Sequence, residues 1–257
     1  MKDMSLYIVS DLHISHAEDP LYHSLLNLLN NRAMKGDTVI FAGDIFDLFV
    51  GPKKIFKNRY VHFLRAVVAA GQRGVSLHYI EGNHDFLLQG VFSKKTGVQV
   101  YSQEFSIEIQ GKRFFVAHGD LVDSRDYGYR ALRLFFRSTL MKILVHVVPG
   151  SWLDWVGKMS SRKSRKSNSI GESGRSTQRM QVLRKLYRNF AAERLALGYD
   201  FVILGHCHDL DEMHFSLGGR PGQYINVGYP RLHGSFLSWT PGEEKIHREK
   251  LPDPSYC

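Results

Sequence analysis

Short apolar runs alternate with longer stretches of helical spacing in the first third of the chain. The runs at 6–10, 38–42 and 76–80 are rich in β-branched and aromatic residues, and they predict three short strands. Between them, residues 22–34 and 59–70 repeat Leu, Val and Phe at helical spacing. Strands that alternate with helices favour a sheet with helices packed on its faces.

The pattern becomes β-rich in the middle of the chain. Residues 105–109 and 113–117 flank a Gln-Gly pair and predict a hairpin. Residues 201–204 read as a buried strand, and 213–247 predict short strands joined by Gly-Gly and Pro-Gly turns. We therefore expect an α/β (α+β) fold in which two stacked sheets carry outer helices.

One segment interrupts this pattern, and we interpret residues 131–198 as a helical insertion or cap. Residues 1–130 and 199–257 are expected to form the core around it. Inside the insertion, residues 140–155 are strongly apolar and are broken by a Pro-Gly pair. No apolar run in the sequence reaches the length of about 20 residues that a membrane-spanning helix needs.

The net charge of +9 changes the picture of the insertion. Residues 158–188 hold ten of the 34 Lys and Arg but one of the 25 acidic residues, so the remaining 24 of each sign cancel. The segment is interpreted as a solvated helix face, a contact for acidic phospholipid headgroups, or a contact for nucleic acid. The neighbouring apolar stretch favours lipid, and we expect no nucleic-acid partner.

Five short polar motifs stand directly after apolar runs that predict strands. They are Asp11-Leu-His13, Gly43-Asp44-Ile-Phe-Asp47, Gly82-Asn83-His84-Asp85, His118-Gly119-Asp120 and Gly205-His206-Cys-His208. In Asp-x-His and His-x-His the alternate side chains of an extended backbone point to the same side. The carboxyl ends of strands are where α/β folds place their ligands. We therefore expect these motifs to meet at one site.

Aspartate, asparagine and histidine are ligands that suit a pair of divalent cations. Two such ions need a bridging carboxylate, and Asp44 is the natural bridge. The expected ligands are Asp11, His13 and His208 at one ion and Asn83, His118 and His206 at the other. We expect Mn, with Fe or Zn as alternatives.

Each residue of this set has a simpler explanation when it is taken alone. A buried histidine is more often a satisfied core residue, and an aspartate at a strand end is more often a helix cap. Five motifs in this order resemble the calcineurin-like metallophosphoesterase superfamily, whose pattern runs D-x-H, GD-x-x-D, GNHD, a later His and GH-x-H. The resemblance implies a four-layer α-β-β-α sandwich with a dinuclear metal centre.

A closer resemblance is to the family of UDP-2,3-diacylglucosamine hydrolases of lipid A synthesis. It rests on GNHDFLL at 82–88, on HGDLVDSRDYGYRALR at 118–133, and on an insertion in the position of that family's lipid-binding cap. The resemblance implies a cytoplasmic enzyme, peripheral to the inner membrane, that cleaves the pyrophosphate of UDP-2,3-diacylglucosamine. The products would be UMP and 2,3-diacylglucosamine 1-phosphate.

The same resemblance implies the substrate contacts. Asp126 and Tyr129 fall on the family's D-x-x-Y pattern, and Ser164 and Asn168 fall on its S-x-x-x-N pattern. The family has a Lys three residues after that Asn, where this chain has Gly171, and we expect Arg175 to take the place of that Lys. The family also typically reads GNRDF where this chain has His84. The implied substrate-binding set is Asn83, His84, Asp126, Tyr129, Ser164, Asn168, Arg175 and His206.

We assign catalytic roles to Asn83, His84 and Asp85. Asn83 would stabilise charge on phosphoryl oxygens, and His84 would act as a general acid or as a charge stabiliser. Asp85 would orient His84, or else cap the residues that follow it. Asp47 and Asp120 are interpreted as residues that hold the ligands in place, or as strand-end caps.

Two other functions remain open at this level. The chain could be a phosphodiesterase or phosphatase that acts on soluble nucleotides, in which case the cap needs no apolar groove. It could also be a metal-binding scaffold without catalysis. The intact ligand set and His84 argue against the scaffold.

Overall fold

The computed structural model describes residues 4–92, 96–150, 152 and 175–251. In chain order, its strands are β1 (Leu6–Val9), β2 (Thr38–Phe41), β3 (Phe49–Val50), β4 (Ser76–Ile80), β5 (Asp85–Phe86), β6 (Val98–Tyr101), β7 (Glu104–Ile109), β8 (Lys112–Ala117), β9 (Phe201–Leu204), β10 (Glu212–Leu217), β11 (Arg220–Asn226), β12 (Ser235–Trp239) and β13 (His247–Lys250). The helices are α1 (Pro20–Asn27), η1 (Leu28–Arg32), α2 (Lys54–Arg59), α3 (Val61–Gln72), η2 (Leu88–Gly90), α4 (Tyr127–Arg137), α5 (Thr139–Val147), α7 (Arg175–Ala196) and α8 (Pro230–His233).

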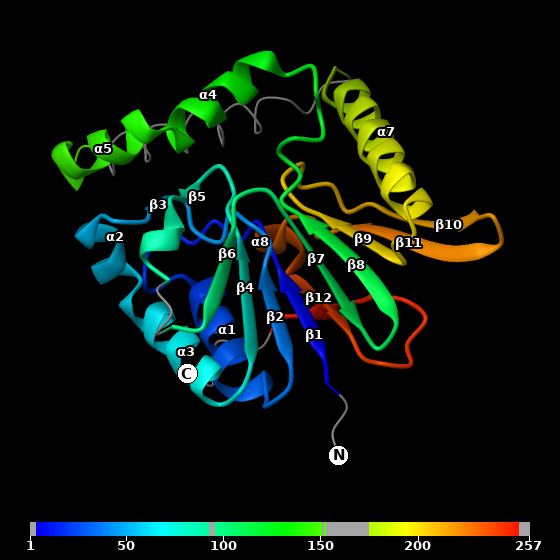
Figure 1. Cartoon of the computed structure of the whole chain (residues 1–257), viewed down its shortest axis with the longest axis horizontal. Helices are drawn as coiled ribbons and strands as arrows, with labels where there is room; N and C mark the ends of the chain where they lie inside the picture. Colours follow the sequence, from blue (N-terminus) through cyan, green and yellow to red (C-terminus); the bar gives the residue numbers. More distant parts are fainter. Residues whose placement is uncertain (1–3, 93–95, 151, 153–174, 252–257) are drawn as a thin grey trace.

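Two large sheets form the centre of the molecule (Figure 1). The first has the order β13-β12-β1-β2-β4-β6, in which β1, β2, β4 and β6 are parallel. The second has the order β10-β11-β9-β8-β7, with β8, β9 and β11 parallel. The short strands β3 and β5 pair separately. The strands expected at 6–10, 38–42, 76–80 and 201–204, and the hairpin, are all confirmed.

The buried strands carry apolar side chains on both faces of each sheet, which explains why the sheets stack. In β1, Leu6 and Ile8 point between the two sheets, whereas Tyr7 and Val9 point to the outer face of the first sheet. In the second sheet, Phe114 points between the sheets and Phe115 points outward. Because alternate strand residues face opposite sides, one apolar run fills two layers of core.

Helices cover both outer faces and complete a four-layer α-β-β-α sandwich. α1 and α3 pack on the first sheet through residues such as Leu25 and Phe63. α7 packs on the second sheet through Tyr187, Ala191 and Leu195. The expected sandwich is therefore confirmed. α7 falls inside the predicted insertion, yet its second half supplies an outer layer of the sandwich.

The predicted helices differ from the observed ones in two details. In the first helical stretch, α1 ends at Asn27 and the chain continues as the π-helical turn η1. There the N–H of Ala33 donates to the carbonyl of Leu28 at 2.9 Å. The second stretch, 59–70, corresponds to α3, and a separate short helix that was not predicted, α2, precedes it and ends next to Tyr60. Tyr60 is fully buried among aromatic rings, so tertiary packing decides the break.

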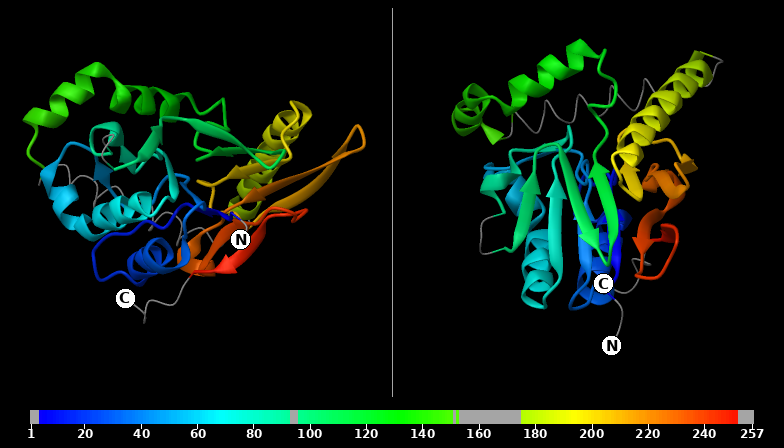
Figure 2. Two further views of the ribbon diagram at one scale, coloured as in Figure 1. Left: turned by 60° about the horizontal axis from the view of Figure 1, so that its bottom comes forward. Right: turned by 45° about the vertical axis from the view of Figure 1, so that its right-hand side comes forward.

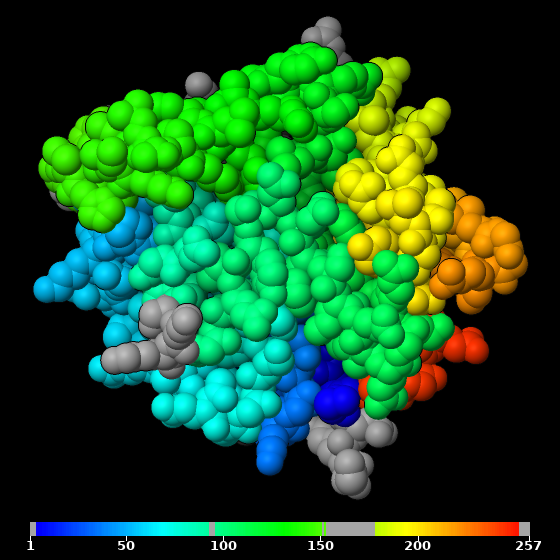
Figure 3. Space-filling model, viewed as in Figure 1, coloured from blue at the N-terminus to red at the C-terminus, as the bar shows by residue number. Residues whose placement is uncertain are grey.

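α4 and α5 run across one end of the sandwich, where Figures 1 and 2 show them above the strand ends. Figure 3 shows them as a continuous ridge. The ridge carries exposed apolar side chains, among them Leu134, Leu140, Ile143 and Val147, which are 57–77% exposed. Within the described part of the chain, none of the helices has the length and apolar character needed to cross a bilayer.

Candidate metal centre

The five polar motifs meet where the two sheets come together. Three of them follow β1, β2 and β4 of the first sheet, and two follow β8 and β9 of the second. Backbone hydrogen bonds join neighbouring motifs: the N–H of Asp11 donates to Gly43, and the N–H of Gly205 donates to His118. The site is therefore built from loops that each sheet fixes at a strand end.

We call the first group of predicted ligands site 1; it consists of Asp11, His13 and His208. The Nε2 atoms of His13 and His208 are 3.2 Å apart, and His208 Nε2 lies 3.3 Å from Asp11 Oδ1. Two ring nitrogens and a carboxylate oxygen thus converge on one point. This is a donor set that fits a divalent cation.

Site 2 consists of Asn83, His118 and His206. His118 Nε2 lies 3.1 Å from Asn83 Oδ1 and 3.2 Å from His206 Nδ1. The carbonyl of Ala42 can only accept, so Nδ1 of His118 donates to it at 3.1 Å, and Nε2 is the ring nitrogen that faces the site. This arrangement also fits a cation.

Asp44 stands between the two sites. Its Oδ2 lies 3.9 Å from His13 Nε2 and 3.5 Å from His118 Nε2. Its Oδ1 instead accepts the N–H of His84 at 2.9 Å, which fixes the carboxylate plane. Oδ2 is therefore the oxygen that faces a histidine nitrogen of each site.

Backbone strain concentrates at these ligands. Among the described residues, five of the seven non-glycine positions with positive φ are predicted ligands: Asp11, His13, Asp44, His206 and His208, with φ between 47° and 68°. Such left-handed conformations cost free energy for residues with a Cβ, and they persist where the surroundings enforce them. The strain accompanies the direction of five side chains, from the loops after β1, β2 and β9, toward one point.

Two glycines permit the close approach of these loops. A Cβ on Gly82 would lie 2.1 Å from Asp44 Oδ1, and a Cβ on Gly205 would lie 2.4 Å from Asp11 Oδ2. Both values are far below van der Waals contact. The residue before Asn83 and the residue before His206 must therefore lack a side chain.

The substitution Gly82→Ala is expected to lower both metal content and turnover, the latter on the order of 100-fold, because the added methyl group displaces the Asp44 carboxylate. Gly90→Ala is the matched control, since a Cβ there would meet nothing within 4 Å. Metal analysis and initial rates measure both effects. Equal metal content in the two variants would contradict the close packing of Gly82 against Asp44.

Electrostatics prepare the centre for cations. Burial lowers the pKa of His13 to about 3 and that of His206 to about 4, so both rings are neutral lone-pair donors at neutral pH. Burial opposes protonation of His118 too, but the charge of Asp44 outweighs it and raises the pKa of His118 to about 10, so the metal-free ring carries a proton that a cation bound there would displace. His118 and the other histidines in turn hold the pKa of Asp44 well below its usual range, although burial acts in the opposite sense.

Asp85 supports the centre from behind. It is fully buried, and its carboxylate accepts the N–H groups of Asp44, Ile45 and Gly82 at 2.7–3.0 Å and the hydroxyl of Tyr79 at 2.6 Å. Burial, followed by the charge of Asp44, raises the pKa of Asp85 to about 7. These contacts match neither interpretation made from the sequence. Asp85 joins the Asp44 loop to the Gly82 loop; it neither orients His84 nor caps a helix.

His84 lies beside site 1. Its ring contacts that of His13 edge-on, with centroids 5.0 Å apart, and a ring nitrogen lies within 4.8 Å of donor atoms of His13 and Asp44. The ring Nδ1 donates to the carbonyl of Asp47 at 2.8 Å, because a carbonyl oxygen can only accept. The proton on Nδ1 is thereby fixed, which leaves Nε2 for chemistry. Asp47 also approaches His13 Nδ1 at 3.7 Å.

The other predicted substrate contacts are placed unevenly. Tyr129 lies near site 2, its ring 6.0 Å from that of His206. Asp126 is exposed and caps α4 by accepting the N–H of Tyr129 at 2.9 Å. Arg175 begins α7, and only its backbone is described. Ser164 and Asn168 lie outside the described residues.

Two arginines on α4, neither of which was predicted to have a role, form hydrogen bonds with the loops that carry Asp120 and Gly82. Arg133 donates to Asp120 Oδ2 at 2.6 Å and to the carbonyl of Ser102 at 2.6 Å, while Tyr129 also donates to Asp120. Arg137 donates to the carbonyl of Gly82 at 2.9 Å. Tyr129, Arg133 and Arg137 are spaced by four residues, so a polar stripe on one helix face was the available signal.

Arg133→Met is expected to destabilise the protein by about 3–5 kcal/mol, because it leaves the carboxylate of Asp120 buried without its charged partner. Urea unfolding measures the change in the free energy of unfolding. Arg130→Met, on the same helix, is the control. A loss below about 1 kcal/mol, the range of an exposed ion pair, would show that the Arg133–Asp120 pair does not anchor α4.

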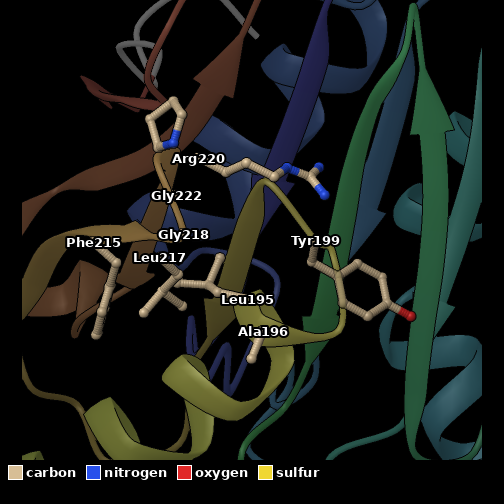
Figure 4. Close-up of a pocket in the computed structure, with 9 residues that line it drawn as sticks. Leu195, Ala196, Tyr199, Phe215, Leu217, Gly218, Arg220 and Gly222 are labelled. Carbon is tan, nitrogen blue, oxygen red and sulfur yellow. The ribbon is translucent and has the colours of Figure 1, made fainter.

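A separate hollow of about 300 Å³ lies between the end of α7 and the β10–β11 hairpin (Figure 4). Its described lining residues are Leu195, Ala196, Tyr199, Phe215, Leu217, Gly218, Arg220, Pro221 and Gly222. None of these is a carboxylate or a histidine, so the hollow has no ligand set like that of sites 1 and 2.

The fold and the ligand set define a metal-dependent phosphoesterase. The family model for calcineurin-like phosphoesterases matches residues 4–210, and the chain belongs to this family. The chain is therefore a hydrolase whose chemistry uses divalent metal ions.

Similar proteins extend over nearly the whole chain. A protein of Aeromonas salmonicida named UDP-2,3-diacylglucosamine hydrolase is 29% identical over 255 residues, which cover 97% of this chain and 95% of that protein. A protein of Nitrosococcus oceani with the same name is 27% identical and covers 98% of each chain. A solved structure from Streptococcus pneumoniae TIGR4, described as a predicted phosphoesterase, has a TM-score of 0.41 at 12% identity, covering 98% of this chain and 92% of that one.

Proposed function

We propose that this phosphoesterase hydrolyses the pyrophosphate bond of UDP-2,3-diacylglucosamine to give UMP and 2,3-diacylglucosamine 1-phosphate. The observation that carries the proposal is similarity along the full length to proteins of that name, with 97% of the chain aligned. The aligned region includes the α4–α5 ridge as well as the metal centre. An enzyme that acts only on soluble nucleotides has no need of the ridge's apolar side chains.

The proposed cofactor is a pair of Mn²⁺ ions; Fe²⁺ and Zn²⁺ accept the same ligands. Site 1 would hold one ion and site 2 the other, with Asp44 shared between them. When bound, the cations lower the pKa of water and neutralise charge on the phosphoryl oxygens. The fixed orientations of His118 and Asp44 support this assignment, since each residue makes a hydrogen bond to the backbone of a neighbouring loop.

His84 is the proposed general acid. The hydrogen bond from its Nδ1 to Asp47 keeps one proton in place, so Nε2 is the atom that gives a proton to the leaving oxygen. Asn83, whose Oδ1 faces His118, has an amide that can stabilise charge on phosphorus-bound oxygens. Both residues belong to one loop, which Asp85 and Arg137 hold from two sides.

The remaining proposed contacts lie beside site 2, at the start of α4 and in the insertion. Tyr129 and His206 would meet the substrate beside site 2, and Asp126 would meet it at the start of α4. Ser164, Asn168 and Arg175 are proposed contacts from the insertion, residues 131–198. The exposed apolar side chains of α4 and α5 would hold the acyl chains and rest on the inner membrane, which makes the enzyme cytoplasmic and peripheral.

Rates on two substrates test this function. Purified protein with Mn²⁺ is expected to release UMP from UDP-2,3-diacylglucosamine and also to hydrolyse bis-p-nitrophenyl phosphate. Introducing charge into the ridge, as in Ile143→Glu, should raise KM for the acylated substrate by about tenfold, since one charged side chain costs an apolar contact more than about 1.4 kcal/mol. The small ester should be unaffected.

Leu197→Glu is the control, because Leu197 is 65% exposed at the end of α7 and outside the ridge. Equal KM values for the two variants would exclude acyl binding by the ridge. Hydrolysis of nucleotide substrates alone, with no turnover of the acylated sugar nucleotide, would overturn the proposed substrate.

A further inference from the structure

The segment that follows β11 contacts site 1 without supplying a predicted ligand. It runs from Asn226 through the short helix α8, and two of its side chains reach the site from the first turn of that helix. Neither Tyr229 nor Arg231 belongs to the five polar motifs.

Arg231 holds the backbone of His13. Its Nη2 donates to the carbonyl oxygen of His13 at 2.6 Å and also to the carboxylate of Asp19. Asp19 is buried and caps α1 by accepting the N–H of Leu21 at 3.1 Å. One guanidinium therefore fixes the peptide after His13 to the start of α1.

Tyr229 holds the ring of His208. The two rings stack with centroids 4.4 Å apart and an angle of 9° between their planes. The ring of Tyr229 also lies 6.1 Å from that of His13. Stacking restricts rotation of the imidazole, and this keeps His208 Nε2 directed at Asp11.

Both held residues are strained. His13 has φ of 47° and His208 has φ of 56°, in the left-handed region that is uncommon for residues with a Cβ. Strained conformations persist only where neighbouring contacts enforce them. Arg231 and Tyr229 supply such contacts at two of the three site 1 ligands.

Asn226 fixes the segment relative to the His206–His208 loop. Its buried amide donates to the carbonyl of Gly205 at 3.1 Å and to the sulfur of Cys207 at 3.2 Å, and its oxygen accepts the N–H of Gly228 at 3.0 Å. These bonds join the end of β11 to the loop after β9, which carries His208, and to Gly228 just before Tyr229.

We propose that Tyr229 and Arg231 are positioning residues that set the metal affinity of site 1 selectively, so that this segment controls whether the centre holds one ion or two. The inference rests on the proposed dinuclear function. Site 2 has separate supports, among them the hydrogen bond from His118 to Ala42 and that from Tyr187 to Gly119. Loss of the α8 contacts should therefore weaken one ion and spare the other.

Titration of the metal-free full-length chain with Mn²⁺ tests this, with calorimetry and electron paramagnetic resonance as readouts. The wild type should bind two ions and give the spectrum of a spin-coupled pair. Tyr229→Leu should weaken one ion by about 10–100-fold and the other by less than about twofold, the range seen when a residue that supports a ligand is removed. Its spectrum at one equivalent should be that of an isolated ion. Tyr229→Phe, which keeps the stacking ring, should behave as the wild type.

Two further comparisons separate positioning from general instability. Leu232→Ala changes an α8 side chain that is 75% exposed and should leave both affinities unchanged. In a double-mutant cycle, adding Tyr229→Leu to His208→Ala should weaken site 1 no further, because Tyr229 acts through the His208 ring. Arg231→Met is the second variant, with the same expected selectivity.

If the wild type binds two ions and Tyr229→Leu binds both with unchanged affinity, the inference is wrong. The proposed function would be unaffected by that result. Additive effects in the cycle, or equal weakening of both ions, would also overturn the inference. A wild-type chain that binds fewer than two ions would overturn both the inference and the dinuclear function.

Discussion

Asp44→Ala is expected to abolish binding of both metal ions and to lower turnover by far more than ~100-fold, the upper range for residues that only support a ligand. The physical reason is that Asp44 Oδ2 is shared: it lies within 4 Å of a histidine nitrogen in each site. Removing it also leaves His118 without the buried carboxylate that accounts for its raised pKa. No other predicted ligand belongs to both sites.

Metal analysis by mass spectrometry and hydrolysis of bis-p-nitrophenyl phosphate measure the two effects of Asp44→Ala. Glu18→Ala is the control, because this acid is 85% exposed on the loop before α1. His206→Ala should lose one ion rather than two, since it removes a ligand from site 2 alone. An Asp44→Ala variant that stays active with two ions bound would contradict the shared bridge.

His84→Ala is expected to lower turnover by about 10²–10⁴-fold while the metal content stays at the wild-type level, because its ring gives a proton and is not a predicted ligand. The backbone N–H of residue 84 still reaches Asp44 in the variant, so the bridge keeps its orientation. Rates and metal content are measured on the same sample.

His16→Ala is the control for His84, since His16 has a side chain that is 59% exposed. A variant of His84 with normal turnover would exclude the proton-transfer role. Loss of metal together with turnover would instead show that His84 is a metal ligand. Its position near His13 and Asp44 would allow that role.

Much of the fold follows from local sequence pattern. The strands β1, β2, β4, β8 and β9 are mostly buried apolar runs, and a polar motif follows each of them, so their positions and their shared site are visible without coordinates. Helix α2 was missed because its six residues are too few to show a helical repeat, and the packing of Tyr60 against Phe46, where α2 gives way to α3, appears only in three dimensions.

The predicted ligands were identified from motifs, whereas the residues that hold those ligands in place, such as Asp85 and Arg231, were not recognised in that role. Asp85 stands in the GNHD motif, yet its partners are backbone N–H groups from two loops, which no side-chain pattern reports. Arg231 lies 218 residues from His13. Contacts between distant loops and backbone atoms depend on the fold, so the sequence contains no local signal for them.

Anomalous diffraction from crystals grown with Mn²⁺ tests the dinuclear centre most directly. The geometry predicts two peaks about 3.5–4 Å apart, the separation of two-metal sites, with one beside His13 and His208, the other beside His118 and His206, and Asp44 Oδ2 between them. A single peak, or a pair of peaks away from Asp44, would contradict the account.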